Sequence, residues 1–240
     1  MRLVVATQNA HKVAEIRAVL GGNFQCLTLK NFAEAPKTIE NVGTFAGNAT
    51  KKAVELARWL ARTRPSTLNY QLSALHVLAD DSGLEVDALG GAPGVYSARY
   101  AVMNGTVPGP SASASTNATD ADNNAKLLRL LKDVPPDKRT GRFRCVLALT
   151  PILSEAKSIS SPVCYADEME LQTELFEGVC EGRIAFAPRG QGGFGYDPLF
   201  IPDGYQQSFA ELGEDVKNRL SHRARALAKL RERLGSSKSD

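Results

Sequence analysis

Short apolar runs recur along the chain and predict the strands of a sheet. Residues 3–6 form a continuous apolar run, and residues 75–79, which are apolar except for His76, lead directly into Asp80. Further strands are expected at residues 24–29, 84–89 (as strand or turn), 142–149 and 175–186, the last bent at Gly178 and Gly182. Helical runs alternate with these strands, and this alternation is typical of an α/β protein.

Four longer segments carry apolar residues at helical spacing. The first contains Ile16 and Leu20 on its apolar face and is expected to stop at Gly21. The second covers about residues 44–62, with an apolar face from Phe45 to Leu60. The other two are expected at about residues 121–132, capped by Asp120, and at about residues 215–234.

Two segments show no clear periodicity. Residues 104–119 are small and polar, which predicts a mobile loop or linker. Residues 152–172 are ambiguous and are interpreted as an edge strand with a variable loop. Neither segment marks a clean domain boundary, so residues 1–240 are expected to form a single domain.

The composition limits the classes of function. A hydrophobic content of 43% allows one sizeable core, or two lobes that share a sheet. The net charge of +3 against 23% charged residues is nearly balanced, so no nucleic-acid or membrane partner is expected and an anion site must be local.

The cysteines and the apolar run lengths indicate a compartment. Four cysteines form no close pair, which favours reduced core thiols over a disulfide framework or a metal site. No run is long enough to span a bilayer, and the first apolar run is too short for a secretory core. A cytoplasmic location is therefore expected.

The first candidate for chemistry is the strand-to-helix turn Thr7-Gln8-Asn9-Ala10-His11-Lys12. A helix N-terminus offers N–H groups and a partial positive charge to an anion, and Lys12 adds a full charge. The alternative is that Asn9 is a plain N-cap.

The second candidate is Asp80-Asp81-Ser82-Gly83. Adjacent carboxylates repel each other and need solvent, cations or a metal to stay ionised. One or two carboxylates combined with substrate phosphates are a usual way of holding Mg²⁺. The alternative is an acidic turn in which Gly83 supplies a special backbone dihedral.

The third candidate is the glycine-rich segment 189–198. Phe194 and Tyr196 are available to stack on a base, and Asp197 to accept from ring or sugar donors. A glycine-rich hairpin without a ligand is the alternative, and it explains the glycines but neither the aromatic residues nor Asp197.

The fourth candidate is Lys217-Asn218-Arg219-Leu220-Ser221-His222-Arg223. On one continuous helix, Lys217 and Ser221 share a face while His222 and Arg223 point elsewhere. The three cations can reach one ligand only if a helix start or bend falls within the segment. A basic solvated face is the alternative.

These segments and two others match a known family in order. Residues 6–12, 43–53, 79–84, 90–100, 192–198 and 217–223 resemble the motifs of the inosine triphosphatase family, the non-standard purine nucleoside triphosphate pyrophosphatases. The resemblance covers nearly the whole chain.

The resemblance implies an elongated α/β fold with a mixed sheet and flanking helices, forming two lobes around a central nucleotide-binding cleft. It also implies a homodimer, Mg²⁺ dependence, and hydrolysis of ITP, dITP or XTP to the monophosphate and pyrophosphate, which cleanses the nucleotide pool.

By motif position, Asp81 activates water and contacts the metal, helped by Asp80 or Glu40. The residues that the resemblance implies for substrate binding are Thr7, Gln8, Asn9, Ala10, His11, Lys12, Lys52, Ser82, Phe194, Gly195, Tyr196, Asp197, Lys217, His222 and Arg223. His222 and Arg223 are the candidate donors to a 6-oxo group, and a 6-amino purine would leave such donors unpaired.

The chain departs from the family pattern at two places. Ile39-Glu40-Asn41-Val42-Gly43 stands where the family carries Glu-Glu-Thr-Gly, so only Glu40 survives as a second carboxylate. Gly47 stands where the family favours Glu, which would complete a capping box with Thr44. Gly47 is expected to cost about 1 kcal/mol of helix stability.

Two other functions remain open from the sequence. One is a pyrophosphatase of pyrimidine or modified triphosphates. The other is a nucleotide-binding protein that has lost catalysis, for which the change at Gly47 is the one indication.

Overall fold

The protein is described from a computed structural model of the 240-residue chain. The described residues are 2–22, 24–32, 34–65, 75–103, 117–153, 170 and 172–236. The predicted loop at residues 104–119 and the ambiguous segment 152–172 lie mostly outside these residues.

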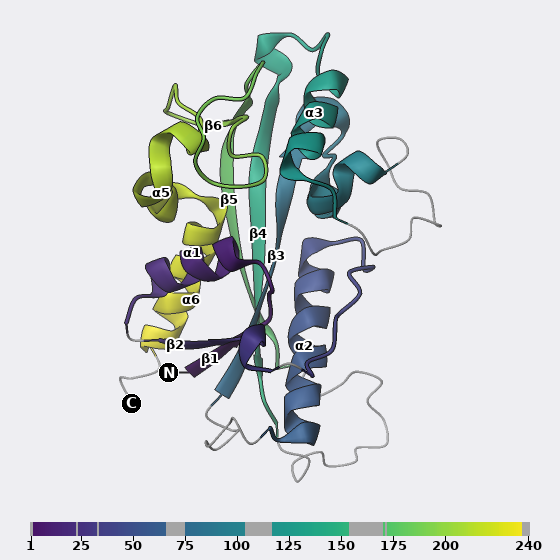
Figure 1. Cartoon of the computed structure of the whole chain (residues 1–240). Helices are drawn as coiled ribbons and strands as arrows, with labels where there is room; N and C mark the ends of the chain where they lie inside the picture. The colour runs from purple at the N-terminus through teal and green to yellow at the C-terminus, as the bar shows by residue number, and fades with distance from the viewer. Residues whose placement is uncertain are drawn as a thin grey trace. The chain divides into compact units, whose positions relative to one another are not determined.

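A mixed sheet of six strands organises the fold, in the order β2-β1-β3-β4-β5-β6 (Figure 1). β1 (Arg2–Val5) pairs in parallel with β2 (Gln25–Thr28) and with β3 (Leu75–Val86). β5 (Glu174–Ile184) pairs antiparallel with β6 (Phe200–Pro202), and β4 (Thr140–Pro151) lies between β3 and β5. The α/β class predicted from the sequence is confirmed.

The chain divides into two compact units. Unit 1 comprises residues 1–81, 146–176 and 229–240, and unit 2 comprises residues 82–145 and 177–228. Both units are built from interleaved segments, because β3, β4 and β5 each continue from one unit into the other.

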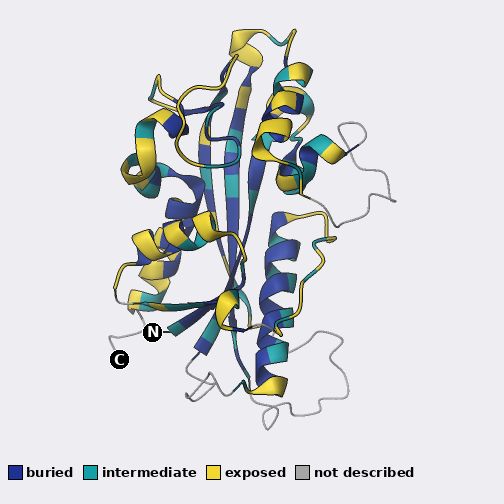
Figure 2. Ribbon diagram, viewed as in Figure 1, coloured by how far each residue is buried: buried dark blue, intermediate teal, exposed yellow. Residues whose placement is uncertain are grey.

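Unit 1 contains β1, β2 and the first two helices. α1 (Ala10–Leu20) buries Ile16 and Leu20 and ends at Gly21, as predicted. α2 (Phe45–Thr63) buries the apolar face that its periodicity predicts, including Phe45, Ala53 and Leu60 (Figure 2). Thr44 caps this helix by accepting a hydrogen bond from the Gly47 backbone N–H at 3.1 Å.

Unit 2 has an aromatic core. Phe200 packs against Phe143 and Phe209, with ring centroids 4.7 and 5.4 Å away. Short 3-10 turns cover Asp87–Leu89, Gly94–Val102 and Pro136–Lys138, and α3 (Asp120–Leu130) follows the second of them. Another 3-10 turn, Leu29–Asn31, belongs to unit 1. The cap of α3 was predicted wrongly, because Thr119 accepts from the Asp122 N–H and Asp120 is the first helical residue.

The single helix predicted at residues 215–234 is two helices, α5 (Phe209–Leu220) and α6 (His222–Ser236). Ser221 separates them with an extended backbone, φ −66° and ψ 161°. The Ser221 hydroxyl accepts from the Ala224 N–H at 3.2 Å, which caps the new helix start. The break falls within the basic segment 217–223. The basic side chains of this segment can reach one ligand only with such a helix start or bend.

The glycines of β5 have a packing role. A Cβ at Gly178 would lie 2.0 Å from the His222 carbonyl oxygen, and one at Gly182 would lie 2.4 Å from the Ile201 carbonyl oxygen. These glycines therefore allow close approach of α6 and β6 to the strand.

Two of the three described cysteines are core thiols, as predicted, whereas Cys26 is only partly buried. Cys26, Cys145 and Cys180 are free thiols, and the last two are buried. Burial raises the pKa of the Cys180 thiol to about 11, so it stays protonated in the core.

Candidate active site

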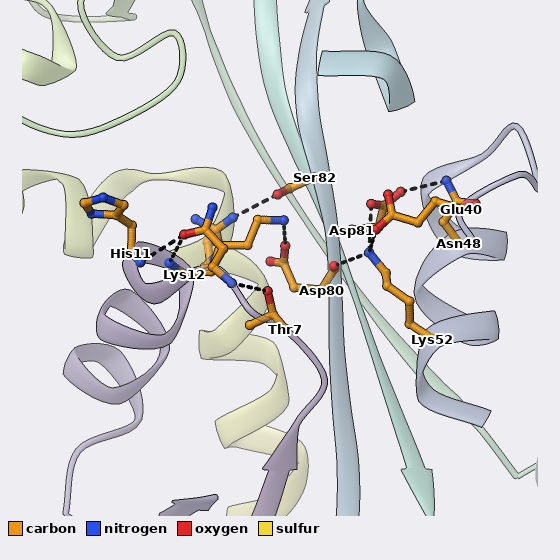
Figure 3. A network of polar contacts seen from close by, with 11 residues as sticks. Thr7, His11, Lys12, Glu40, Asn48, Lys52, Asp80, Asp81 and Ser82 are labelled. Atoms are coloured by element: carbon orange, nitrogen blue, oxygen red, sulfur yellow. Dashed lines mark hydrogen bonds and ion pairs between the residues drawn. The ribbon is translucent and has the colours of Figure 1, made fainter. Parts of the chain in front are cut away.

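The acidic pair lies inside a strand. β3 runs unbroken from Leu75 to Val86, so the acidic turn considered as the alternative for residues 80–83 is not formed. Gly83 has no positive φ and supplies no turn dihedral. Both carboxylates are buried, Asp80 at 1% and Asp81 at 5% exposure. Successive side chains of a strand point to opposite faces, and Figure 3 shows Asp80 and Asp81 doing so.

Asp80 faces α1. Its carboxylate forms an ion pair with the Lys12 ammonium, and the Asp80 side chain is fully buried. A buried carboxylate needs such a cation, because burial disfavours its charged form. The strand therefore separates the Asp80 carboxylate from the contacts that the Asp81 carboxylate makes (Figure 3).

Asp81 faces α2 and the segment before it. Its Oδ1 accepts from Lys52 Nζ at 3.0 Å, and its Oδ2 accepts from Asn48 Nδ2 at 3.1 Å. Lys52 Nζ also donates to Glu40 Oε1 at 3.2 Å and to the Asp80 carbonyl oxygen at 2.7 Å. One ammonium group thus brings the carboxylates of Asp81 and Glu40 together.

The electrostatics of this group follow from burial and charge. Burial raises the pKa of Asp81, and the ammonium groups of Lys52 and Lys12 oppose that rise without reversing it. Burial lowers the pKa of Lys52, but the carboxylates of Asp81, Glu40 and Asp80 more than reverse it, so the net shift is upward. Lys52 therefore stays cationic, and Asp81 holds a proton more readily than an exposed aspartate.

The strand-to-helix turn at residues 7–12 uses Asn9 as an N-cap. Asn9 Oδ1 accepts from the backbone N–H groups of His11 and Lys12 at 2.9 and 3.2 Å. Thr7 Oγ1 accepts from the Asn9 N–H at 3.2 Å. Gln8, Asn9, Ala10 and His11 are exposed. Asn9 already binds two of the first-turn N–H groups, so these groups are not available to an anion. The positive charge that this turn offers to an anion therefore comes mainly from the Lys12 side chain.

In unit 2, the two basic residues after the helix break, His222 and Arg223, are buried. Arg223 is 1% exposed, and its Nη2 donates to Ser82 Oγ at 2.8 Å. His222 is 4% exposed and stacks on Phe143, with ring centroids 4.8 Å apart. Arg223 therefore contacts β3 through Ser82, a contact that the sequence did not predict.

The glycine-rich segment binds Lys217. Asp197 Oδ2 accepts from Lys217 Nζ at 2.5 Å and from the Phe194 N–H at 2.8 Å. Lys217 Nζ lies 4.3 Å from the centroid of the half-buried Phe194 ring. A Cβ at Gly193, which has a φ of +74°, would lie 2.2 Å from Asp197 Oδ2, so glycine is required there.

Tyr196 belongs to the core of unit 2. It is 4% exposed, its hydroxyl donates to the Ser97 carbonyl oxygen at 2.9 Å, and burial raises its pKa. It is therefore not exposed for stacking on a base, and Phe194 is the aromatic residue that keeps this role.

Several site contacts were not predicted from the sequence. One is the hydrogen bond from Asn48 to Asp81. The others join α3 to Gly195. Asp120 Oδ2 accepts from the Gly195 N–H at 2.6 Å, and Asn124 Nδ2 donates to the Gly195 carbonyl oxygen at 3.0 Å. Asn48 lies within the matched segment 43–53, so its polar side chain in an apolar helical face was an available signal. Asp120 and Asn124 carried no such signal.

Within the described part of the chain, no three His, Cys, Asp or Glu side chains form a cluster that could hold a metal by themselves. The acidic residues predicted for the metal separate into Asp81 with Glu40, and Asp80 on the other side of β3 (Figure 3). Among the described helices, none is long and apolar enough to cross a membrane.

Fold and site together define an α/β protein whose paired lysines and carboxylates suit an anionic, phosphate-bearing ligand. The chain belongs to the Ham1 family, whose model matches residues 3–233. A relative from Opitutus terrae, named dITP/XTP pyrophosphatase, is 41% identical over 239 residues and covers 97% of this chain and 98% of its own. A relative of the same name from Geobacter sulfurreducens is 43% identical over 235 residues, with coverage of 98% and 96%. The structure of a HAM1 protein from Coxiella burnetii superposes with a TM-score of 0.72 at 34% identity, covering 98% of this chain and 99% of that one.

Proposed function

We propose that the protein hydrolyses the non-standard purine triphosphates dITP, XTP and ITP to the nucleoside monophosphate and pyrophosphate. Two relatives that match this chain over nearly their full length are named dITP/XTP pyrophosphatase. The observation that carries the proposal is Asp81, a buried carboxylate with a raised pKa whose two oxygens are held by Lys52 and Asn48. A fixed carboxylate of this kind suits the orientation and deprotonation of an attacking water.

Mg²⁺ is the metal we assign to this site, held by Asp81 and Glu40. Oxygens of both carboxylates lie within 3.2 Å of the same Lys52 Nζ, so they converge on one point. Two carboxylates completed by substrate phosphates and water are a usual Mg²⁺ environment. When bound, the metal would screen the charge that develops on the leaving pyrophosphate. We assign Asp80 to holding Lys12, because it lies on the other side of β3.

The remaining residues of unit 1 bind phosphate in this proposal. Lys12 and Lys52 supply fixed positive charge, and both are held in place by carboxylates. Preorganised cations stabilise developing negative charge without reorganising during the reaction. Thr7, Gln8, Asn9, Ala10 and His11 form the turn that presents Lys12.

The residues of unit 2 bind the nucleoside in this proposal. Phe194 stacks on the base. The hydrogen-bonded pair of Lys217 and Asp197 supports the Phe194 ring, since Lys217 Nζ packs against that ring. Ser82, Gly195, His222 and Arg223 complete the set, and Tyr196 supports it from the core. A donor set that fits a 6-oxo purine disfavours a 6-amino purine by about 1–3 kcal/mol per unpaired group.

We further propose a single pyrophosphatase domain that acts as a homodimer in the cytoplasm. The interleaving of both units along the chain supports the single domain, and the free thiols of Cys26, Cys145 and Cys180 support a reducing compartment. Size-exclusion chromatography with light scattering tests the dimer, and a monomer at micromolar concentration would contradict it.

The decisive experiment measures pyrophosphate release from dITP, XTP, ITP, ATP and dCTP, each with and without Mg²⁺. We expect fast release from the first three substrates, slow release from ATP and dCTP, and none without a divalent metal. Equal kcat/KM for ATP and ITP would refute the selectivity. Preferred cleavage of dCTP would indicate a pyrimidine enzyme, and binding without release an inactive nucleotide-binding protein.

A further inference from the structure

We propose that Asn48 is a positioning residue of the reaction, which fixes the Asp81 carboxylate and ties to it the loop that carries Glu40. This inference rests on the proposed function for its effect on turnover. The two contacts of Asn48, with Asp81 and with the loop, can also be measured in the protein without substrate.

The Asn48 side chain is 1% exposed, and both halves of its amide are used. Its Nδ2 donates to Asp81 Oδ2 at 3.1 Å, and its Oδ1 accepts from the Val42 backbone N–H at 3.0 Å. A carboxylate accepts and a backbone N–H donates, so only one orientation of the amide satisfies both partners. The Asn48 amide therefore directs its NH₂ group, which can only donate, at Asp81.

This donor completes the support of the Asp81 carboxylate. Lys52 Nζ donates to one oxygen and Asn48 Nδ2 to the other, so rotation of the carboxylate breaks at least one bond. Because catalysis by a general base depends on near-attack geometry, a freely rotating carboxylate loses rate even when substrate binding is unchanged.

The same helix face holds the loop at residues 39–43. Asn48 binds the Val42 N–H, Lys51 Nζ donates to the Ile39 carbonyl oxygen at 2.9 Å, and Lys52 Nζ donates to Glu40 Oε1 at 3.2 Å. Residues three and four apart lie on one helix face, so Asn48, Lys51 and Lys52 reach the loop together. The amide of Asn48 therefore connects Asp81 to the loop that carries Glu40.

The departure of this chain at Gly47 fits this arrangement. A Cβ at position 47 would lie 2.3 Å from Val42 Cγ1 and 2.9 Å from Thr44 Oγ1. A larger residue at position 47 would require the Val42 side chain to move. Gly47 is thus the sterically matched neighbour of Val42, and the two departures from the family pattern belong to one packing arrangement.

Two substitutions separate the two halves of the amide. Asn48→Asp keeps an acceptor for the Val42 N–H but presents a second oxygen to Asp81, which replaces donation by repulsion. Asn48→Leu, of similar volume, removes both contacts. Asn41→Asp is the matched control, because it makes the same change in the loop at an exposed residue whose Oδ1 accepts from Lys51.

The first readout is the steady-state kinetics of dITP hydrolysis, normalised to the folded fraction. We expect Asn48→Asp to lower kcat at least about tenfold with KM within about threefold of wild type, because the positioning of Asp81 is lost and phosphate binding is kept. Asn41→Asp should retain wild-type kcat. Wild-type kcat in Asn48→Asp would overturn the role at Asp81.

The second readout is nuclear magnetic resonance of the protein without nucleotide. We expect slow hydrogen exchange at the Val42 amide in wild type and in Asn48→Asp, and fast exchange in Asn48→Leu. The Asn48 side-chain amide signals should shift in Asp81→Ala. Fast Val42 exchange in the wild type, or Asn48 signals that ignore Asp81→Ala, would overturn the inference. If wild type released no pyrophosphate, the proposed function would fail while these signals would still decide whether Asn48 holds Asp81 and the loop.

Discussion

The two units use buried charge in different ways. In unit 1, the charged groups form a network in which Lys52 alone contacts two carboxylates and a carbonyl oxygen. In unit 2, Lys217 and Asp197 form a compact pair, 4% and 1% exposed, packed against the Phe194 ring. Lys52 keeps other partners when one contact of the network is lost, whereas removal of Lys217 leaves the buried Asp197 carboxylate without its cation. We therefore expect substitutions in unit 1 to act mainly on turnover, and substitutions of the pair to act also on stability.

The largest effect is expected for Lys217→Met. It removes the ammonium from the buried Asp197 carboxylate, and breaking a buried pair costs about 3–5 kcal/mol of unfolding free energy. Urea denaturation measures this loss, with the exposed Lys132→Met as control. The double variant Lys217→Met/Asp197→Leu should regain much of it. A stability loss of Lys217→Met no greater than that of the control would remove the contrast between the units.

The next effect is expected for Asp81→Asn. Replacing the carboxylate by an amide removes the base and a metal ligand, so kcat should fall about 100-fold or more. The melting temperature should change less than in Lys217→Met, because Lys52 keeps Glu40 and the Asp80 carbonyl oxygen as partners. Pyrophosphate release and a thermal melt of one preparation measure both quantities. Near-normal turnover would exclude Asp81 as the base.

A smaller effect is expected on selectivity from Arg223→Leu. The buried guanidinium, which also binds Ser82, is a candidate donor to the 6-oxo group. Losing one such hydrogen bond should reduce the preference for ITP over ATP by about 1–3 kcal/mol in kcat/KM. Arg231→Leu, at an exposed position of α6, is the control. An unchanged ratio of ITP to ATP would assign selectivity to other residues.

The smallest effect concerns pH and His76 of β3. Burial lowers the pKa of His76 below its ordinary value of 6.5. The unfolded chain therefore binds more protons than the folded one as pH falls through 6.5, and the unfolding free energy should fall with it. His76→Gln should flatten this dependence in urea titrations between pH 5 and 7. A slope equal to that of the wild type would contradict the assignment.

The predictions from sequence succeeded where a local pattern controls the outcome. The helical spacing from Phe45 to Leu60 predicted α2 and its buried face, and Gly21 predicted the end of α1. The acidic turn considered for residues 80–83 was wrong, because pairing within the sheet extends β3 through polar residues that favour turns when read alone.

The candidate site shows the same division. The residue types of Lys12, Lys52, Asp81, Asp197, Lys217 and Arg223 could be selected from sequence, because charged residues next to apolar runs require partners. Which lysine pairs with which carboxylate could not be predicted from the sequence. The match of Lys12 to Asp80, of Lys52 to Asp81 and of Lys217 to Asp197 depends on strand alternation and on the helices packed on each face.

By itself, the sequence determined the α/β class, the four candidate segments of the site and the family resemblance, since these depend on local periodicity and residue chemistry. Tertiary structure alone decided that Asp80 and Asp81 face opposite sides of one strand, that Ser221 breaks the last helix, and that Asn48 binds Asp81. The physical reason is that burial and hydrogen bonding between distant segments select among local conformations of similar free energy. The side chains that hold the reactive carboxylate can be identified only after the chain has folded around it.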